Sequence, residues 1–275
     1  MQHPDQVGEW ITRWLREYAV SSKQKGFVIG ISGGVDSALT STLCALTRLP
    51  VCCVELPLHQ PISQDSRAAQ HVKWLKGKFE NVESVRIDLS SHFDGLIADW
   101  KSTDDAHLQH LTLANTRSRL RMLCLYYQAG IRRFLVAGTG NKVEDFGVGF
   151  YTKYGDGGVD VSPIADLTKT EVRALAKHLG IHDQILTAPP TDGLWEDDRS
   201  DEDQMGATYP ELEWAMEYCD QNGVRENGVW NLASLLNNEL SRRQQEILAI
   251  YVRMHNANRH KMIPIPICEI PKSLR

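Results

Sequence analysis

The stretch VIGISGGVDSALTST, residues 28–42, joins an apolar run to an amphipathic one through three small residues. The β-branched run predicts a buried strand, and residues 35–47 predict a helix. Ser32, Gly33 and Gly34 therefore stand at a strand-to-helix turn, where a glycine can adopt positive φ and backbone N–H groups can approach a phosphate. From this turn alone, a tight structural turn and a phosphate-binding loop both stay open.

The neighbouring polar side chains favour the phosphate-binding loop. Ser32 and Ser37 add hydroxyl donors, while we expect Val35 only to pack. Asp36 could simply complement the helix dipole. Beside phosphates, however, its carboxylate would be repelled unless a divalent cation lay between them, so Asp36 is a candidate Mg²⁺ ligand. The stretch matches neither GxxxxGK[ST] nor GxGxxG, which disfavours a Walker-type NTPase and a hydride-transfer dehydrogenase.

Strands and helices alternate through the first half of the chain. Besides the elements above, apolar periodicity predicts strands at 51–56, 82–89 and 133–139 and helices at 4–20, 63–79 (opened by a Ser cap), 92–101 and 107–129. This alternation predicts an α/β fold, a doubly wound parallel sheet flanked by helices, with ligands at the carboxyl ends of its strands. Both candidate binding turns, after Ile31 and after Ala137, fall at such ends.

The second half of the chain contains two more helices and two irregular segments. Residues 167–181 predict a helix with Thr168 as its cap, and residues near 238–257 predict the last one. Residues 141–160 are glycine-rich and irregular, and residues 189–206 are acidic and turn-rich, typical of a mobile surface loop. No internal repeat or domain boundary is evident, so we expect a single domain over residues 1–275.

The composition narrows the class of protein. The chain has 275 residues, of which 42% are hydrophobic and 24% charged, as in a globular protein. Its formal net charge of −5 argues against an extended nucleic-acid-binding surface but allows a small anionic ligand. No apolar run approaches the roughly 20 residues of a membrane helix, so we expect no membrane partner. The six cysteines show no CxxC spacing, and free thiols fit a reducing cytoplasm.

Several motifs together resemble one family. SGGVDS at 32–37 resembles the pyrophosphate loop of the ATP pyrophosphatases, which use ATP to adenylate a carbonyl or carboxylate oxygen. NTRSRLRM at 115–122, the stretch 136–172, PPTDGLW, DEDQMG and His260-Lys261 resemble the NAD synthetases, in family order. The resemblance implies a Rossmann-like ATP-pyrophosphatase fold. It also implies that ammonia amidates deamido-NAD to NAD through a nicotinate acyl-adenylate, with release of AMP and pyrophosphate.

The same resemblance implies roles for individual residues. The ATP site would be formed by Gly30, Ile31, Ser32, Gly33, Gly34, Val35, Asp36, Ser37, Thr139, Lys169 and Thr191. Mg²⁺ would be held by Asp36 and Glu144, with Asp36 and Lys169 as catalytic groups. Deamido-NAD would contact Arg119, Lys153, Asp160, His260 and Lys261. A homodimer is implied as well, with the dinucleotide near the subunit interface. Ser118 departs from the pattern, since many relatives have alanine there.

Ordinary structural roles remain open for several of these residues. A helix would spread Arg117, Arg119 and Arg121 around its axis, so at most one or two can reach a ligand. Lys169 near a helix start opposes the helix dipole, although a nearby triphosphate would reverse the sign. Glu144 by itself is an exposed loop acid.

Two further groups of side chains allow both interpretations. His260-Lys261 could merely complement a helix C-terminus. Phe150, Tyr151 and Tyr154 lie in a glycine-rich loop rather than on a regular element, which suggests a stacking surface for a pyridine or adenine ring. The run Asp201–Asp203 is most simply part of a solvated loop.

The implied chemistry sets further expectations. Attack of a carboxylate on ATP needs neutralisation of charge by Mg²⁺, Lys169 and the loop amides. The adenylate then needs protection from water, for which 189–206 is the candidate closing loop. The synthetase pattern begins in the first helix and leaves no room for a glutaminase domain. We therefore expect free ammonia as the nitrogen donor, unless a separate glutaminase subunit supplies it.

Two rival functions are weaker. Another adenylating enzyme, such as a tRNA thiolase or a GMP synthetase, is the first; a tRNA-modifying enzyme would need a basic face or paired catalytic cysteines, and the sequence indicates neither. A regulatory module that binds ATP without turnover is the second. The joint presence of Ser32, Asp36, Ser37 and Glu144 argues against it.

Overall fold

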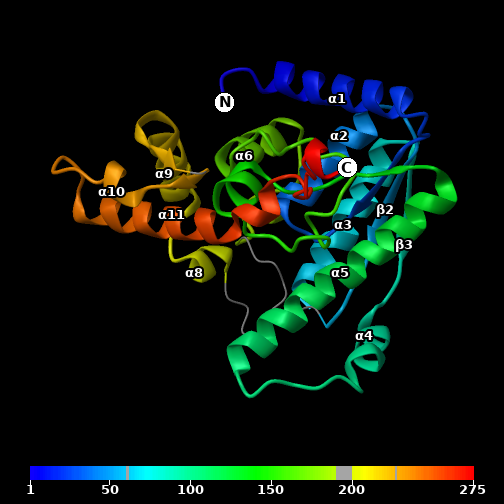
Figure 1. Ribbon diagram of the computed structural model, residues 1–275. Helices are drawn as coiled ribbons and strands as arrows, with labels where there is room; N and C mark the ends of the chain where they lie inside the picture. Colours follow the sequence, from blue (N-terminus) through cyan, green and yellow to red (C-terminus); the bar gives the residue numbers. More distant parts are fainter. Residues whose placement is uncertain (60–61, 190–199, 227) are drawn as a thin grey trace.

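A parallel sheet lies at the centre of the larger part of the molecule (Figure 1). The computed structural model describes residues 1–59, 62–189, 200–226 and 228–275. The four strands run in the order β3-β2-β1-β4 and comprise β1 (Phe27–Gly30), β2 (Val51–Glu55), β3 (Val82–Arg86) and β4 (Leu135–Val136). All three pairings are parallel, with Phe27 opposite both Val51 and Leu135. The carboxyl ends of these strands consequently share one edge.

Helices cover both faces of this sheet. One face carries α1 (Pro4–Ser21), α2 (Val35–Leu46), α3 (Ile62–Lys78) and α6 (Lys169–His178), and the other carries α4 (Ser90–Ile97) and α5 (Ala106–Arg132). Side chains alternate between the two cores along each strand, so Cys53 packs beneath α2 while Cys52 packs beneath α5. The predicted doubly wound α/β fold is confirmed.

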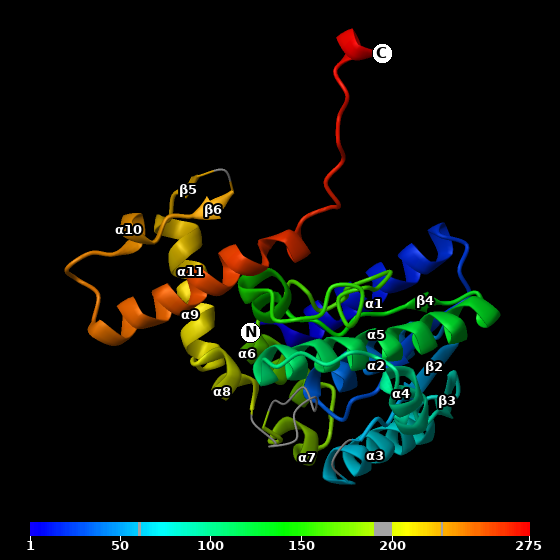
Figure 2. The ribbon, with the colours of Figure 1, turned by 60° about the horizontal axis from the view of Figure 1, so that its bottom comes forward.

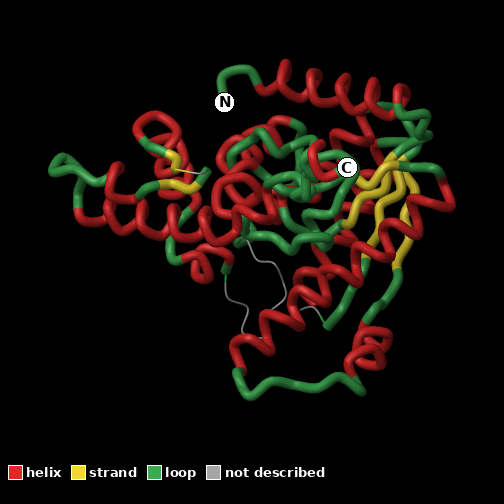
Figure 3. Tube along the Cα trace, in the orientation of Figure 1, coloured by secondary structure: helices red, strands yellow, loops and turns green. Residues whose placement is uncertain are grey.

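A second, mainly helical part lies beside the sheet, on the left in Figures 1 and 3. It contains the π-helix η1 (Lys142–Val148), α8 (Asp201–Met205), α9 (Tyr209–Asn222), α10 (Leu232–Leu235), α11 (Arg242–Met262) and the antiparallel pair β5 (Arg225–Glu226) and β6 (Val229–Trp230). Its own core is buried around Tyr209, Leu212 and Tyr251. Two short elements complete the chain, α7 (Asp183–Leu186) and the 3₁₀ turn η2 (Lys272–Leu274).

Some expectations from the sequence are wrong in detail. Residues 141–160 are not wholly irregular, because Asn141 caps the helix η1 inside them. Residues 200–206 are not a simple surface loop either: Ser200 caps α8, and Asp201 in the acidic run is only 7% exposed. The helix α3 begins at Ile62, one residue before the expected serine cap, and the side chain of Ser63 lies outside the described residues. The remainder of the expected loop, 190–199, lies outside the described residues.

The C-terminal arm, residues 263–275, extends away from the rest of the molecule (Figure 2). Its apolar side chains are exposed, with Ile265 at 66% and Ile267 at 84%. Cys268 on the arm is exposed as well, whereas Cys44, Cys52 and Cys53 are buried. Within the described parts of the chain, no helix combines the length and apolarity needed to cross a membrane.

Removal of the Thr168 hydroxyl tests how the chain fixes the start of α6. Thr168 Oγ1 accepts the N–H of Glu171, which confirms the predicted cap, and the Glu171 carboxylate accepts the N–H of Thr168, which completes a capping box. We expect Thr168→Ala to lower the free energy of unfolding by about 1 kcal/mol. Thr168→Ser keeps the acceptor oxygen and should be close to wild type. Urea unfolding of both variants measures the difference, and equal losses would contradict this role.

Candidate active site

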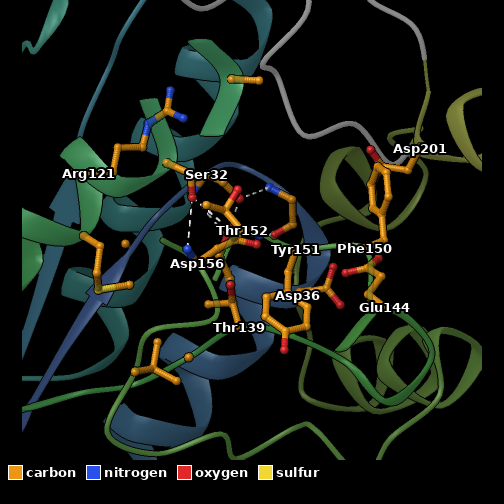
Figure 4. Close-up of a pocket in the computed structure, with 18 of the residues that line it drawn as sticks. Ser32, Asp36, Arg121, Thr139, Glu144, Phe150, Tyr151, Thr152, Asp156 and Asp201 are labelled. Atoms are coloured by element: carbon orange, nitrogen blue, oxygen red, sulfur yellow. Dashed lines mark hydrogen bonds between the residues drawn. The ribbon is translucent and has the colours of Figure 1, made fainter. Parts of the chain in front are cut away.

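A cavity of about 700 Å³ opens at the carboxyl ends of the strands. The residues that follow β1 and β4 line it together with the N-terminal ends of α2 and α6, the middle of α5, and η1 (Figure 4). The wall also includes Asp201 of α8 and the last residues of α11, so both parts of the molecule contribute. Ligand binding at this edge is the expected arrangement for a parallel doubly wound sheet.

The turn after β1 forms an ordered loop at one end of this cavity. Gly33 has φ +81°, the positive φ that such a turn requires of one glycine. Ser32 Oγ lies 3.0 Å from Ser37 Oγ and accepts the backbone N–H of Gly34 at 3.2 Å. Gly34 also precedes the first residue of α2, so the positive end of that helix dipole lies at this loop.

Asp36, Glu144 and Lys169 meet beside this loop. Lys169 Nζ donates to Asp36 Oδ2 at 2.6 Å and to Glu144 Oε1 at 2.9 Å. The lysine side chain is 3% exposed and each carboxylate side chain 16% exposed, so all three charges are largely withdrawn from water. The two carboxylates thus converge on one point at the cavity wall.

One buried amide orients both carboxylates. Asn141, which is fully buried, donates from Nδ2 to Asp36 Oδ1 at 3.2 Å. Its Oδ1 accepts the backbone N–H groups of Val143 and Glu144, each at 3.1 Å, and so caps η1. The π-helix is anchored at its other end, where His255 of α11 lies 2.7 Å from the carbonyl oxygen of Gly147. The position of Glu144 therefore depends on long-range contacts.

The charges in this cluster reinforce one another. Burial alone would lower the pKa of Lys169, but the two carboxylates outweigh it and raise that pKa above its usual value. Burial raises the pKa of Asp36, and Lys169 opposes the rise. For Glu144, the effect of burial is outweighed by Lys169 and by the Tyr209 hydroxyl, so its pKa is lowered. Two carboxylates face one ammonium, which leaves capacity for a further cation.

The donor set fits Mg²⁺ better than a metal held by protein ligands alone. Across the described ranges, no group of three or more His, Cys, Asp or Glu side chains is placed to enclose a metal ion. Mg²⁺ commonly takes one or two carboxylates and completes its coordination with water and substrate phosphates. Asp36 and Glu144, converging beside the glycine loop that follows β1, supply such a pair.

Basic side chains gather at another part of the cavity. Arg119 Nε donates to the carbonyl oxygen of Lys153 at 3.2 Å, and Lys153 Nζ donates to that of His260 at 2.9 Å. Lys261 Nζ donates to the carbonyl oxygen of Tyr151 at 2.7 Å. These contacts bring α5, the loop after η1 and the end of α11 together. Cationic groups remote in sequence thus share one wall, as an anionic ligand would require.

Most of the residues singled out in the sequence line this one cavity. They are Gly30, Ile31, Ser32, Gly33, Gly34, Val35, Asp36, Ser37, Arg119, Thr139, Glu144, Lys153, Lys169, His260 and Lys261. Asp160 does not line it: its carboxylate accepts the N–H of Val136 at 2.8 Å and the hydroxyl of Tyr126 at 3.1 Å. Thr191 lies outside the described residues.

The arginine and aromatic sets divide between the cavity and the rest of the protein. Arg119 and Arg121 line the cavity, whereas the guanidinium of Arg117 lies 4.9 Å from the centre of the Phe93 ring. Among the aromatic residues, Phe150 and Tyr151 line the wall (Figure 4), while Tyr154 is 59% exposed and does not line it. A stacking surface is thus available from two of the three aromatic rings.

Sequence patterns alone did not indicate several residues of the site. Arg67 and Arg173 line the cavity from α3 and α6, and neither stands in a recognisable motif. Ser118 donates to Asp156 Oδ1 at 2.7 Å and accepts the backbone N–H of Asp156 at 3.0 Å, which gives the departure from alanine a structural purpose. The hydroxyl of Tyr209, which does not line the cavity, donates a hydrogen bond to the carboxylate of Glu144. Only the fold reveals these partners.

Comparison with known proteins agrees with this geometry. A profile of the NAD synthase family matches residues 7–262. The NH(3)-dependent NAD(+) synthetase of Carboxydothermus hydrogenoformans is 37% identical over 205 residues, which cover 74% of this chain and 82% of that protein. That of Methanosarcina acetivorans is 37% identical over 224 residues, 78% of this chain and 82% of its own.

Solved structures are similar over nearly the whole chain. The NMN synthetase from Francisella tularensis superposes with a TM-score of 0.78 at 28% identity, covering 98% of both chains. The NH3-dependent NAD synthetase from Campylobacter jejuni superposes with a TM-score of 0.73 at 25% identity, covering 97% of this chain and 99% of that one. The chain therefore belongs to the NAD synthase family, whose ammonia-dependent members amidate deamido-NAD to NAD with ATP, the final step of NAD biosynthesis.

Proposed function

We propose that the cavity binds ATP, deamido-NAD and Mg²⁺ together and that residues 1–275 act as one catalytic unit. The observation that carries this proposal is the continuity of the cavity. A phosphate-binding loop, the converging pair Asp36 and Glu144, and the basic wall around Arg119 and Lys261 all line the same space. An ATP molecule on the loop and a dinucleotide on the basic wall would bring their reactive groups together between them.

The first step is attack of the pyridine carboxylate on the α-phosphorus of ATP. The loop from Ser32 to Ser37 holds the phosphates, and Lys169 reduces the repulsion between the two anions. Asp36 and Glu144 would hold the metal, which supplies charge neutralisation at the phosphates. The oxygen–phosphorus bond to pyrophosphate breaks as the carboxylate–phosphorus bond forms, and an acyl-adenylate results.

The second step is attack of ammonia on the activated carbonyl. Neutral ammonia adds to the carbonyl carbon, one proton is lost, and AMP leaves as the amide forms. The protein's part is to keep water away from the adenylate while ammonia enters. Phe150 and Tyr151 lie in the cavity wall and offer ring surface on which the pyridine can stack.

The decisive experiment compares nitrogen donors and acceptors. With ATP and purified protein, we expect pyrophosphate release and amide formation with ammonium plus deamido-NAD, and none with glutamine alone. Nicotinate mononucleotide belongs in the same assay, because one of the similar structures is an NMN synthetase. A larger kcat/KM for the mononucleotide than for deamido-NAD would reassign the acceptor, and AMP formation without acceptor preference would contradict the proposed function.

Replacement of Asp36 tests the metal assignment. Asp36→Asn keeps the shape of the side chain but removes the charge that would hold Mg²⁺, so adenylation should fall by about a hundredfold or more. The fold should persist, as measured by circular dichroism. Asp166→Asn is the matched control, since Asp166 is 97% exposed and pairs with Lys142 at the surface. Full activity of Asp36→Asn would show that the metal assignment is wrong.

We also propose a homodimer in a cytoplasmic setting. Leu123, Tyr127 and Ile131 recur every four residues on α5 and are 67%, 65% and 61% exposed, so they form an apolar stripe on one face of that helix. An exposed stripe of this kind favours association with a second copy across a two-fold axis. Six free cysteines support a reducing compartment.

A charge placed in the stripe tests the dimer. We expect Leu123→Asp to convert the dimer to a monomer, because an aspartate would have to be desolvated at the interface. Sedimentation velocity measures the change in mass. Leu236→Asp, at a residue of 42% exposure beyond α10, should leave the mass unchanged. A monomeric wild type, or a Leu123→Asp variant that stays dimeric, would count against this interface.

A further inference from the structure

Tyr209 lies behind the carboxylate pair rather than at the cavity surface. It is fully buried at the first residue of α9 and does not line the cavity, although Glu144 and Lys169 do. Its phenolic hydroxyl donates a hydrogen bond to Oε1 of Glu144.

Two donors therefore hold the same oxygen of Glu144. Lys169 Nζ donates to Oε1 from the cavity side at 2.9 Å, and Tyr209 donates from the core side. In the proposed function Lys169 also interacts with the phosphates of ATP, so these phosphates compete with Glu144 for the ammonium group. Tyr209 has no access to the cavity and thus no such competitor, and its bond can persist when ATP is present.

Tyr209 also connects Glu144 with α8. Its backbone N–H donates to Glu202 Oε1 at 2.9 Å, and its hydroxyl lies 3.5 Å from Asp201 Oδ2. Asp201 is buried and lines the cavity, where Figure 4 shows it on the same side as Glu144. The phenol thus connects a candidate metal ligand on η1 with Asp201 of α8.

We propose that Tyr209 is a positioning residue for the metal site. Its hydroxyl fixes the Glu144 carboxylate so that it faces Asp36, and this sets the affinity of the enzyme–ATP complex for a divalent cation. The inference rests on the proposed function, in which Asp36 and Glu144 hold the metal. Partners of this kind behind a ligand are known to tune metal affinity, because they restrict the orientation of the ligating atom.

Tyr209→Phe separates the hydroxyl from the packing of the ring. Mn²⁺ is the probe ion, titrated into enzyme with an ATP analogue whose α–β bridge cannot be cleaved and followed by electron paramagnetic resonance. We expect Mn²⁺ to bind about tenfold more weakly. The Mg²⁺ concentration for half-maximal activity should rise to match, while the KM for deamido-NAD stays close to wild type.

Tyr251→Phe is the matched control. Tyr251 is 1% exposed in the same core, on α11, so its loss of a buried hydroxyl resembles that at Tyr209 without touching Glu144. Its Mn²⁺ affinity should equal that of wild type. Wild-type Mn²⁺ affinity in Tyr209→Phe would overturn the inference, and so would an equal weakening in both variants, since that would indicate a general effect on packing.

Glu144→Gln distinguishes failure of this inference from failure of the proposed function. Unchanged Mn²⁺ binding in Glu144→Gln would overturn the metal assignment and the inference with it. Weakened binding in Glu144→Gln together with wild-type binding in Tyr209→Phe would overturn the inference alone. If both hold, the double variant should bind Mn²⁺ no more weakly than Glu144→Gln, because the two groups act through one carboxylate.

Discussion

The contact of one ammonium with two carboxylates organises the candidate active site. Lys169 reaches Asp36 across 133 positions of sequence and Glu144 across 25, and so joins the starts of α2 and α6 to the π-helix. Loss of the ammonium would leave two like charges together away from water, an arrangement that is strongly destabilising. The sheet, the glycine loop after β1 and the helical part must all be in place for this contact to form.

Local patterns predicted the sheet and its flanking helices because those elements carry their signals in their own residues. The β-branched run before Ser32, the glycine turn and the capping box at Thr168 are each readable within a few positions. The π-helix has a local signal only at its start, where Asn141 caps it. Its other end is held by side chains of α11 more than 100 residues away, such as His255, so a glycine-rich sequence looked irregular.

Some residues of the candidate site could likewise be predicted from the sequence, and others could not. Physical reasoning on the turn reached a phosphate-binding loop with a metal-binding acid, and family resemblance was needed to select Arg119, Lys153 and the His260-Lys261 pair. Neither physical reasoning on the sequence nor family resemblance identified side chains that act through another side chain. Tyr209 is a core aromatic by every local criterion, and only its bond to Glu144 gives it a further part in the site.

The C-terminal arm has a practical consequence for labelling chemistry. Burial raises the pKa of the Cys44 and Cys53 thiols, and the thiolate is the reactive form. Cys268 is the exposed member of the six cysteines and stands on the arm that begins shortly after Lys261. A thiol-reactive fluorophore would therefore attach to the native chain at a single favoured position, where its emission reports on what surrounds the arm without altering the cavity.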